Sequence, residues 1–348
     1  MADEGNKKRF TLPREIRLLL SFGSLVFVIE YFVLPQFASA RRSLHLLASL
    51  NPIIVLLGVL LEIAAIYSYV ELTRTVLYPH APGRFNILKM NLAGLAISHV
   101  VPGGTAPAGA LSYRVLTELD VPKETSAFGL AVQGSGSAVV LNIIFWMMLV
   151  ISIPLRGFNP AYGFAALAGV FLLAAFFGTI LLITRGQRHA DSWLRAAARH
   201  LPAVNPDRVS KILAQVADRI KLLINNRRTL WWAFTWAGFN WLFDAACLWV
   251  FVWAFGHVMS PIDLLVAYGL ANILAVIPIT PGGLGIIEGV LIPTLEGFGV
   301  PHSQAILAVI SYRLVNFCIP IPIGGVAYAS LQWRRGRMVS PPTPPATD

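Results

Sequence analysis

The chain has 348 residues, of which 56% are hydrophobic and only 13% are charged, and its mean hydropathy is +0.67. Soluble globular proteins have about 45–50% apolar and about 25% charged residues, so a pair of ordinary soluble domains is excluded. The formal net charge of +10 does not indicate a nucleic-acid-binding protein, because few charges remain outside the apolar runs. The composition predicts an all-α polytopic membrane protein.

Six apolar runs are long enough to cross a bilayer as helices. They cover residues 16–36, 51–72, 124–154, 161–184, 229–256 and 302–331. The first run has no cleavage signal after it, so we expect a retained helix and not a signal peptide.

Two further apolar regions, 85–118 and 262–298, do not fit single spans, because Pro-Gly-Gly interrupts each of them. The interruptions are Pro102-Gly103-Gly104 and Pro281-Gly282-Gly283. A proline followed by two glycines does not favour a continuous helix, and the pieces on either side are too short to cross alone. We therefore predict two re-entrant hairpins, each made of two half-helices.

Positive charges predict the orientation in the cell membrane. Lysines and arginines gather before the first span, in the connection 185–228 and after the last span. The positive-inside rule then places the N-terminus, this connection and the C-terminus in the cytoplasm. Arg41 and Arg42 are exceptions, since they fall outside. The predicted segments are the N-terminus 1–15, a first membrane half 16–184, the linker 185–228, a second half 229–331 and a disordered tail 332–348.

The linker 185–228 has ten basic and three acidic residues, and apolar residues recur at helical spacing from 204 to 224. A basic amphipathic helix of this kind can lie on the anionic inner leaflet. A solvated helical linker is the alternative interpretation.

An internal repeat relates the two membrane halves. The two Pro-Gly-Gly motifs are 179 residues apart, and Val121-Pro122 and Val300-Pro301 have the same separation. Each half therefore contains a span, a hairpin and another span, and the predicted topology gives the halves opposite senses. Inverted repeats with broken helices are a recurring transporter plan, with the binding site at the repeat interface. A chance match of small residues in a biased composition is the alternative.

Each predicted break could bind an anion. A half-helix that begins after Gly-Gly presents free backbone N–H groups and the positive end of its dipole. Two such ends at mid-membrane would attract a phosphate or a carboxylate, with Gly103, Gly104, Gly282 and Gly283 allowing close approach. The alternative is that Pro-Gly-Gly only makes the turn.

Ionisable residues inside membrane segments are costly and are functional candidates. Glu288 lies early in the last half-helix and Arg313 lies in the last span, and we expect both to share one site with the two breaks. Asp244 and Glu62 are candidates for the site or for an ion pair. Arg114 ends the first hairpin, where a positive-inside role is the alternative. For Glu288, the alternatives are dipole complementarity and a structural ion pair.

The sequence has no nucleophile elbow and no His or Cys metal pattern. No cofactor, metal or catalytic residue is therefore predicted.

The stretch from Ala275 to Val290, with Pro281-Gly-Gly-Leu-Gly-Ile-Ile-Glu288 inside it, and Tyr312-Arg313 downstream resemble a known family. Val101-Pro-Gly-Gly-Thr-Ala-Pro-Ala-Gly109-Ala-Leu-Ser-Tyr-Arg114 resembles it too. The family is the membrane domain of lysyl-phosphatidylglycerol synthase/flippase proteins and their stand-alone relatives. The resemblance implies phospholipid movement between leaflets. Few residues follow Leu331, so an aminoacyltransferase domain is not expected. Gly109, the repeat partner of Glu288, replaces an acidic residue found in many relatives, which argues against a cationic lipid.

The leading hypothesis is a flippase for an anionic phospholipid or a polyprenyl-phosphate-linked lipid, either as a monomer or as a homo-oligomer. The alternatives are a membrane-embedded enzyme acting on a lipid head group, and a non-catalytic scaffold for an envelope-synthesis enzyme.

Overall fold

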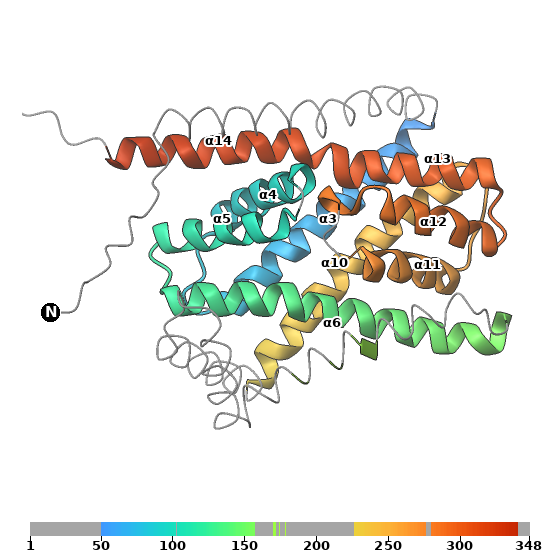
Figure 1. Ribbon diagram of the computed structural model, residues 1–348, viewed down its shortest axis with the longest axis horizontal. Coiled ribbons are helices and arrows are strands. Elements are labelled where there is room, and N and C mark those ends of the chain that lie inside the picture. Colours follow the sequence, from blue (N-terminus) through green and yellow to red (C-terminus); the bar gives the residue numbers. More distant parts are fainter. Residues whose placement is uncertain are drawn as a thin grey trace, which may run out of the picture.

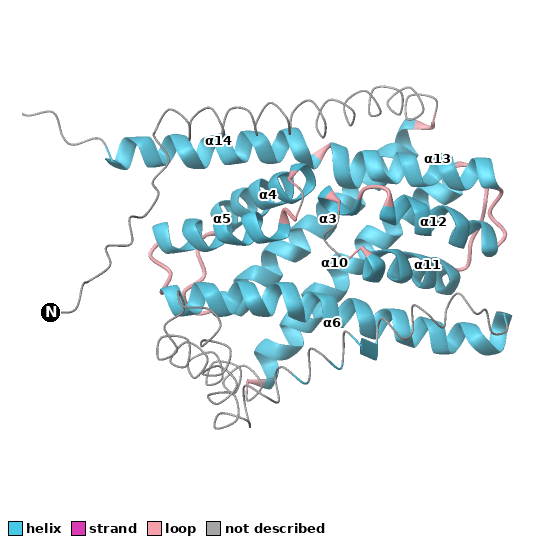
Figure 2. Cartoon of the chain, viewed as in Figure 1, coloured by secondary structure: helices cyan, strands magenta, loops and turns pink. Residues whose placement is uncertain are grey.

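The computed structural model describes residues 50–156 except 102, the single positions 170, 171, 174 and 178, and residues 226–339 except 276–279. In this part of the chain all regular structure is helical, and Figure 2 shows helices joined by short loops without strands. The described structure therefore confirms an all-helical fold.

Four helical segments are long and apolar enough to cross a membrane. They are Pro52–Leu77, Lys123–Ser152, Arg227–Ala254 and His302–Trp333, and they agree closely with four of the six predicted spans. The first three lie in α3 (Pro52–Leu77), α6 (Lys123–Arg156) and α10 (Arg227–Ala254). The predicted span 16–36 lies outside the described residues, and so does nearly all of 161–184. Asn51 and Asn226 begin α3 and α10, because each side chain accepts a hydrogen bond from a backbone N–H of the first turn.

The last predicted span is not one continuous α-helix. It consists of α13 (His302–Arg313), the π-helix η3 (Leu314–Cys318) and α14 (Pro320–Val339). Pro320 has no N–H and would clash with the carbonyl four residues earlier in an α-helix. The wider turn relieves this conflict, and Ile319 N–H donates to Leu314 O instead, at 3.0 Å.

Both Pro-Gly-Gly regions fold as pairs of helices that break at the predicted place. The first pair is α4 (Arg84–Val100) and α5 (Thr105–Glu118), and the second is α11 (Pro261–Leu274) and α12 (Ile286–Gly297). One detail of the prediction is wrong: α12 begins at Ile286 and not directly after the two glycines. A short 3₁₀ turn, η2 (Pro281–Gly283), comes first. Gly282, Gly283 and Gly285 all have positive φ, so the right-handed helix cannot begin until Ile286.

The repeat predicted from the sequence recurs in the order and arrangement of the helices. α6 and α13 begin at Lys123 and His302, which are 179 residues apart. In Figure 1, α6 and the α13–α14 rod run in opposite directions along two sides of the molecule, with the α4–α5 hairpin at one end and α11–α12 at the other.

Helices α3 and α10 cross antiparallel between these two sides. Gly58 near the start of α3 faces Phe251 near the end of α10, whereas Tyr67 meets Trp236 nearer the start of α10. At the crossing, Asn240 donates a hydrogen bond to Ala65 O at 3.0 Å. Since α3 and α10 belong to different halves and run in opposite directions, their packing fits an inverted arrangement of the halves.

Each hairpin packs on the last helix of the other half. A Cβ at Gly324 of α14 would collide with the backbone of Leu92 in α4, and a Cβ at Gly269 of α11 would lie 2.9 Å from the Phe145 ring in α6. Close helix approach at small residues is typical of membrane helices. The two halves are therefore interlocked and do not form two separate bundles.

Candidate functional site

The tips of the two hairpins meet in the interior of the molecule. A Cβ on Gly282 would lie 2.9 Å from Cδ2 of His99 and would overlap the Phe317 ring. His99 belongs to α4 of the first hairpin, and Phe317 belongs to η3. Their rings stack with centroids 4.3 Å apart and an interplanar angle of 22°. The glycine thus lets the second break lie against the end of the first hairpin, as the repeat predicts.

Arg313 lies at this junction and is only 7% exposed. Its Nε donates to Oε1 of Glu288 at 2.6 Å, and its Nη2 donates to the carbonyl oxygen of Gly282 at 3.1 Å. The guanidinium also lies over the Phe317 ring, 4.5 Å from the centroid. A buried cation needs such partners, because leaving water costs several kcal/mol. The structure therefore brings Arg313, Glu288 and Gly282 together.

Glu288 has a second partner in addition to Arg313. Its Oε2 accepts a hydrogen bond from the backbone N–H of Gly285 at 2.6 Å, which caps the start of α12. Both alternatives raised for this residue, helix-dipole complementarity and an ion pair, are thus present in the geometry. The side chain remains 24% exposed, and the neighbouring Gly285 and Gly289 are exposed. The ion pair is consequently accessible from one side.

The remaining predicted glycines surround the breaks in different ways. Gly283 is buried, and its Cβ would lie 3.1 Å from Ala275 Cβ. Gly104 is packed against the end of α4, where a Cβ would lie 2.6 Å from Ser98 Cα and from Val101 O. Gly103 faces open space. Only Gly282 touches the other hairpin directly.

Arg114 lies apart from this junction. It pairs with Glu118 at 3.1 Å, one turn further along α5, and both side chains are about two-fifths exposed. The last turns of α5 are the part of the hairpin most distant from the break. The structure therefore does not bring Arg114 to Glu288 and Arg313.

Asp244 belongs to a second polar cluster, next to the Arg313 junction. Its Oδ1 accepts hydrogen bonds from Tyr312 Oη at 3.0 Å and from Asn316 Nδ2 at 2.9 Å, and its Oδ2 accepts one from Tyr268. Asn316 Nδ2 also donates to Glu62 Oε1 at 3.3 Å. The cluster joins α3, α10, α11, α13 and η3 deep in the protein, and Asp244 and Glu62 are each 8% exposed. We call it the carboxylate cluster.

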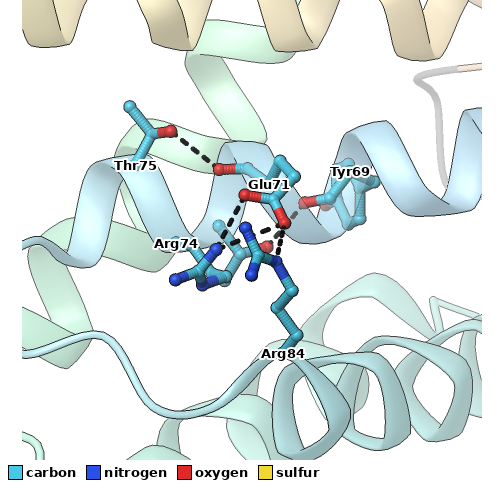
Figure 3. A network of polar contacts seen from close by, with 6 residues as sticks. Tyr69, Glu71, Arg74, Thr75 and Arg84 are labelled. Carbon is cyan, nitrogen blue, oxygen red and sulfur yellow. Dashed lines mark hydrogen bonds and ion pairs between the residues drawn. The ribbon is translucent and has the colours of Figure 1, made fainter.

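A third polar group lies near the end of α3 and anchors the first hairpin (Figure 3). Glu71 pairs with Arg74 at 2.9 Å on its own helix and with Arg84 at 2.5 Å, at the start of α4. The hydrogen bond to Glu71 raises the pKa of Arg84 above its ordinary value. Glu71 is therefore held by two cations, and it ties α3 to the hairpin.

Several residues of the junction and of the carboxylate cluster carried no signal in the sequence. Tyr268, Asn316 and Phe317 became visible only when α11 and η3 were placed beside α10 and α4. A polar Asn inside an apolar run, three residues after Arg313, was the one pattern that could have indicated Asn316. His99 matched its expected packing role, since its ring is stacked and buried beside Phe317.

Comparison with known proteins identifies relatives along most of the chain. A UPF0104 membrane protein of Methanothermobacter thermautotrophicus is 22% identical over 288 residues, which cover 80% of this chain and 85% of the relative. A second UPF0104 membrane protein of the same organism is 22% identical over 338 residues, covering 91% and 95%. A UPF0104 membrane protein of Methanocaldococcus jannaschii is 30% identical over 88 residues, a quarter of each chain.

These names state only that the relatives are membrane proteins. The sequence model of the lysylphosphatidylglycerol synthase TM region matches residues 16–324, which include both hairpins, Glu288 and Arg313. The chain is thus an integral membrane protein that belongs to the lysylphosphatidylglycerol synthase TM region family.

Proposed function

We propose that this protein moves an anionic lipid, a phospholipid or a polyprenyl-phosphate-linked lipid, between the two leaflets of the cell membrane. The observation that carries the proposal is the burial of Arg313 where the two broken hairpins meet. A cation at mid-membrane depth is costly and marks substrate pathways, and an arginine binds phosphate oxygens through several donors at once.

The hairpins act as re-entrant elements in this proposal. In Figure 1 their tips point toward the centre from opposite ends of the molecule, and α6 and α13–α14 run past both. The start of α10 and the end of α14 lie at the end where the α4–α5 hairpin begins. This common side agrees with a cytoplasmic location of the linker 185–228 and the C-terminus. The junction is then reached from one leaflet along each hairpin.

Glu288 gives the site a mechanism for release. Its carboxylate occupies both the guanidinium of Arg313 and a backbone N–H at the start of α12, which are the partners that a phosphate would use. An arriving lipid phosphate exchanges with the carboxylate, and the returning carboxylate expels the phosphate into the other leaflet. The lipid tails stay in the bilayer throughout. Binding and release thus use one set of donors.

The test is leaflet-resolved transport in proteoliposomes. The probes are fluorescent phosphatidylglycerol, polyprenyl phosphate and, as a zwitterionic control, phosphatidylcholine. Glu288→Gln should abolish transport while lipid binding is retained, because an amide does not compete for Arg313. Arg313→Gln should lose binding as well.

Glu296→Gln is the matched control, since Glu296 lies on the same helix α12 and pairs with His302 at its end. This variant should transport at the wild-type rate. Equal rates for phosphatidylcholine and the anionic lipids, or wild-type transport by Glu288→Gln, would overturn the proposal.

A further inference from the structure

The two acids of the carboxylate cluster, Glu62 and Asp244, come from spanning helices of different halves. Both are buried, and one amide group contacts both: Asn316 Nδ2 lies 2.9 Å from Asp244 Oδ1 and 3.3 Å from Glu62 Oε1. Two carboxylates this close together in an apolar interior cannot both remain ionised without a compensating cation, because like charges repel strongly there. The geometry therefore requires either a bound cation or a proton.

The two acids are satisfied very unequally. Asp244 accepts hydrogen bonds from two tyrosine hydroxyls and one amide, which stabilise its ionised form. Glu62 accepts only the long bond from Asn316, and among the described residues its buried Oε2 has no hydrogen-bond partner. A buried carboxylate oxygen without a donor is costly. If this oxygen carries a proton, Glu62 becomes a donor itself and Asp244 is the acid beside it.

A proton fits this cluster better than a metal ion. Metal ions such as Na⁺ or Ca²⁺ are bound by oxygen lone pairs, but those of Asp244 already accept three donors. Among the described residues, no group of three or more His, Cys, Asp and Glu side chains comes together to hold a metal. A proton needs only one donor oxygen and one acceptor oxygen, which this pair supplies.

The other titratable and charged groups around the pair come from each packed helix. Tyr268 of α11 and Tyr312 of α13 donate to Asp244, Cys247 of α10 lies within electrostatic range of both acids, and Arg313 of α13 acts on Asp244. Arg313 is itself paired with Glu288. One cation thus faces three carboxylates, and a proton on Glu62 restores the balance that the single arginine leaves incomplete.

The cluster is joined covalently to the lipid site. Tyr312 contacts Asp244, and the next residue is Arg313; Asn316 contacts both acids, and the next residue is Phe317, beneath the guanidinium. Both connections run through the junction of α13 and the π-helix η3. Such π-turns inside helices are frequent at functional sites. A change in the hydrogen bonds of the acids therefore acts directly on the residues that hold Arg313.

We propose that Glu62 and Asp244 hold one proton between them and exchange it with water during each lipid movement. A proton from water on one side binds a Glu62 oxygen, forms an O–H bond and is donated to Asp244. The same O–H bond breaks when the proton leaves to the opposite side. The exchange during transport rests on the proposed function, whereas the shared proton does not.

Infrared spectroscopy of the purified protein tests the shared proton directly. A protonated carboxylic acid has a C=O band separate from that of a carboxylate. Wild-type protein at neutral pH should show this band, and Glu62→Gln should lose it. Glu71→Gln is the matched control, because Glu71 lies on the same helix and is equally buried, but two arginines keep it ionised. An absent band in the wild type, or an unchanged band in Glu62→Gln, would refute the shared proton.

Transport under a pH gradient tests the exchange. Anionic lipid should move faster in wild-type proteoliposomes with a gradient than without one, and Glu62→Gln should lose this dependence. Transport that ignores the gradient would overturn proton exchange and leave the proposed function intact. An absence of lipid transport under every condition would overturn the proposed function and the exchange, while the infrared result still decides whether the proton is shared.

Discussion

The two hairpin breaks share a backbone plan but differ in what surrounds them. Gly103 and Gly282 are 179 residues apart, and their φ angles are +65° and +53°. A Cβ at Gly103 would meet nothing within 4 Å, whereas a Cβ at Gly282 would run into His99 and Phe317. The same turn is thus free at one break and locked at the other. The repeat dictates the shape of the loops, and neighbouring helices decide what each loop can do.

The charges follow the same division. Glu288 and Arg313 lie in the second half, and the residues 179 positions earlier are Gly109 and Gly134. Both of these glycines are exposed, with open space where a Cβ would be. The second half therefore supplies the ion pair, and the first half supplies small residues beside it. Three substitutions at the glycines test this division.

Gly282→Ala should have the largest effect. The alanine would require a left-handed backbone conformation and would displace the stacked rings of His99 and Phe317, so we expect a loss of about 2–5 kcal/mol in the free energy of unfolding. Denaturation of the detergent-solubilised protein, followed by tryptophan fluorescence, measures this loss. Stability equal to that of the wild type would mean that the two hairpins do not meet at Gly282.

Gly104→Ala should have an intermediate effect of a different kind. Gly104 has a φ of −59°, which suits any residue, but the new Cβ would collide with the backbone at Ser98 and Val101. Backbone atoms cannot move aside as a side chain can, so we expect a loss of about 1–3 kcal/mol. Hydrogen exchange should increase at the end of α4 and remain unchanged at α12. Equal increases in both hairpins would contradict the local origin of the strain.

Gly103→Ala should have the smallest effect, about 1–2 kcal/mol, because only the left-handed conformation opposes it. Gly103→Asn should recover part of this loss, since asparagine tolerates that conformation better. The same denaturation experiment measures both variants. A loss as large as that of Gly282→Ala would show that the first break is packed as tightly as the second.

The fold could largely be predicted from the sequence, because apolar length and Pro-Gly-Gly are local signals. The helices α4, α5, α11 and α12 end within a few residues of the expected positions, and the offset between the halves recurs in the starts of α6 and α13. The π-helix was missed, although Pro320 inside the last apolar run indicates an interruption. The number of spans beyond these helices stays a prediction.

The candidate site could be predicted only in part. The approach of Glu288 to Arg313 was expected because both are ionisable and lie in neighbouring segments. The grouping of Asp244 with Glu62 and Tyr268 depends on how α3 crosses α10 and how α11 packs beside them, which no local pattern encodes. Arg114 was expected near the substrate on sequence grounds, and its exposed pairing with Glu118 depends on which end of α5 faces the interior.

The interlocking of the halves has a consequence for biosynthesis. The buried face of α4, with Ile87, Met90 and Ala93, is covered partly by α14, the last helix of the described chain. At about 5–20 residues per second, the ribosome needs on the order of 10–40 s to proceed from α4 to α14. For this interval the first hairpin stands in the bilayer without its cover, beside a translocon still occupied by later segments. Translation speed and the membrane insertion machinery therefore influence the yield of folded protein as directly as the packing itself.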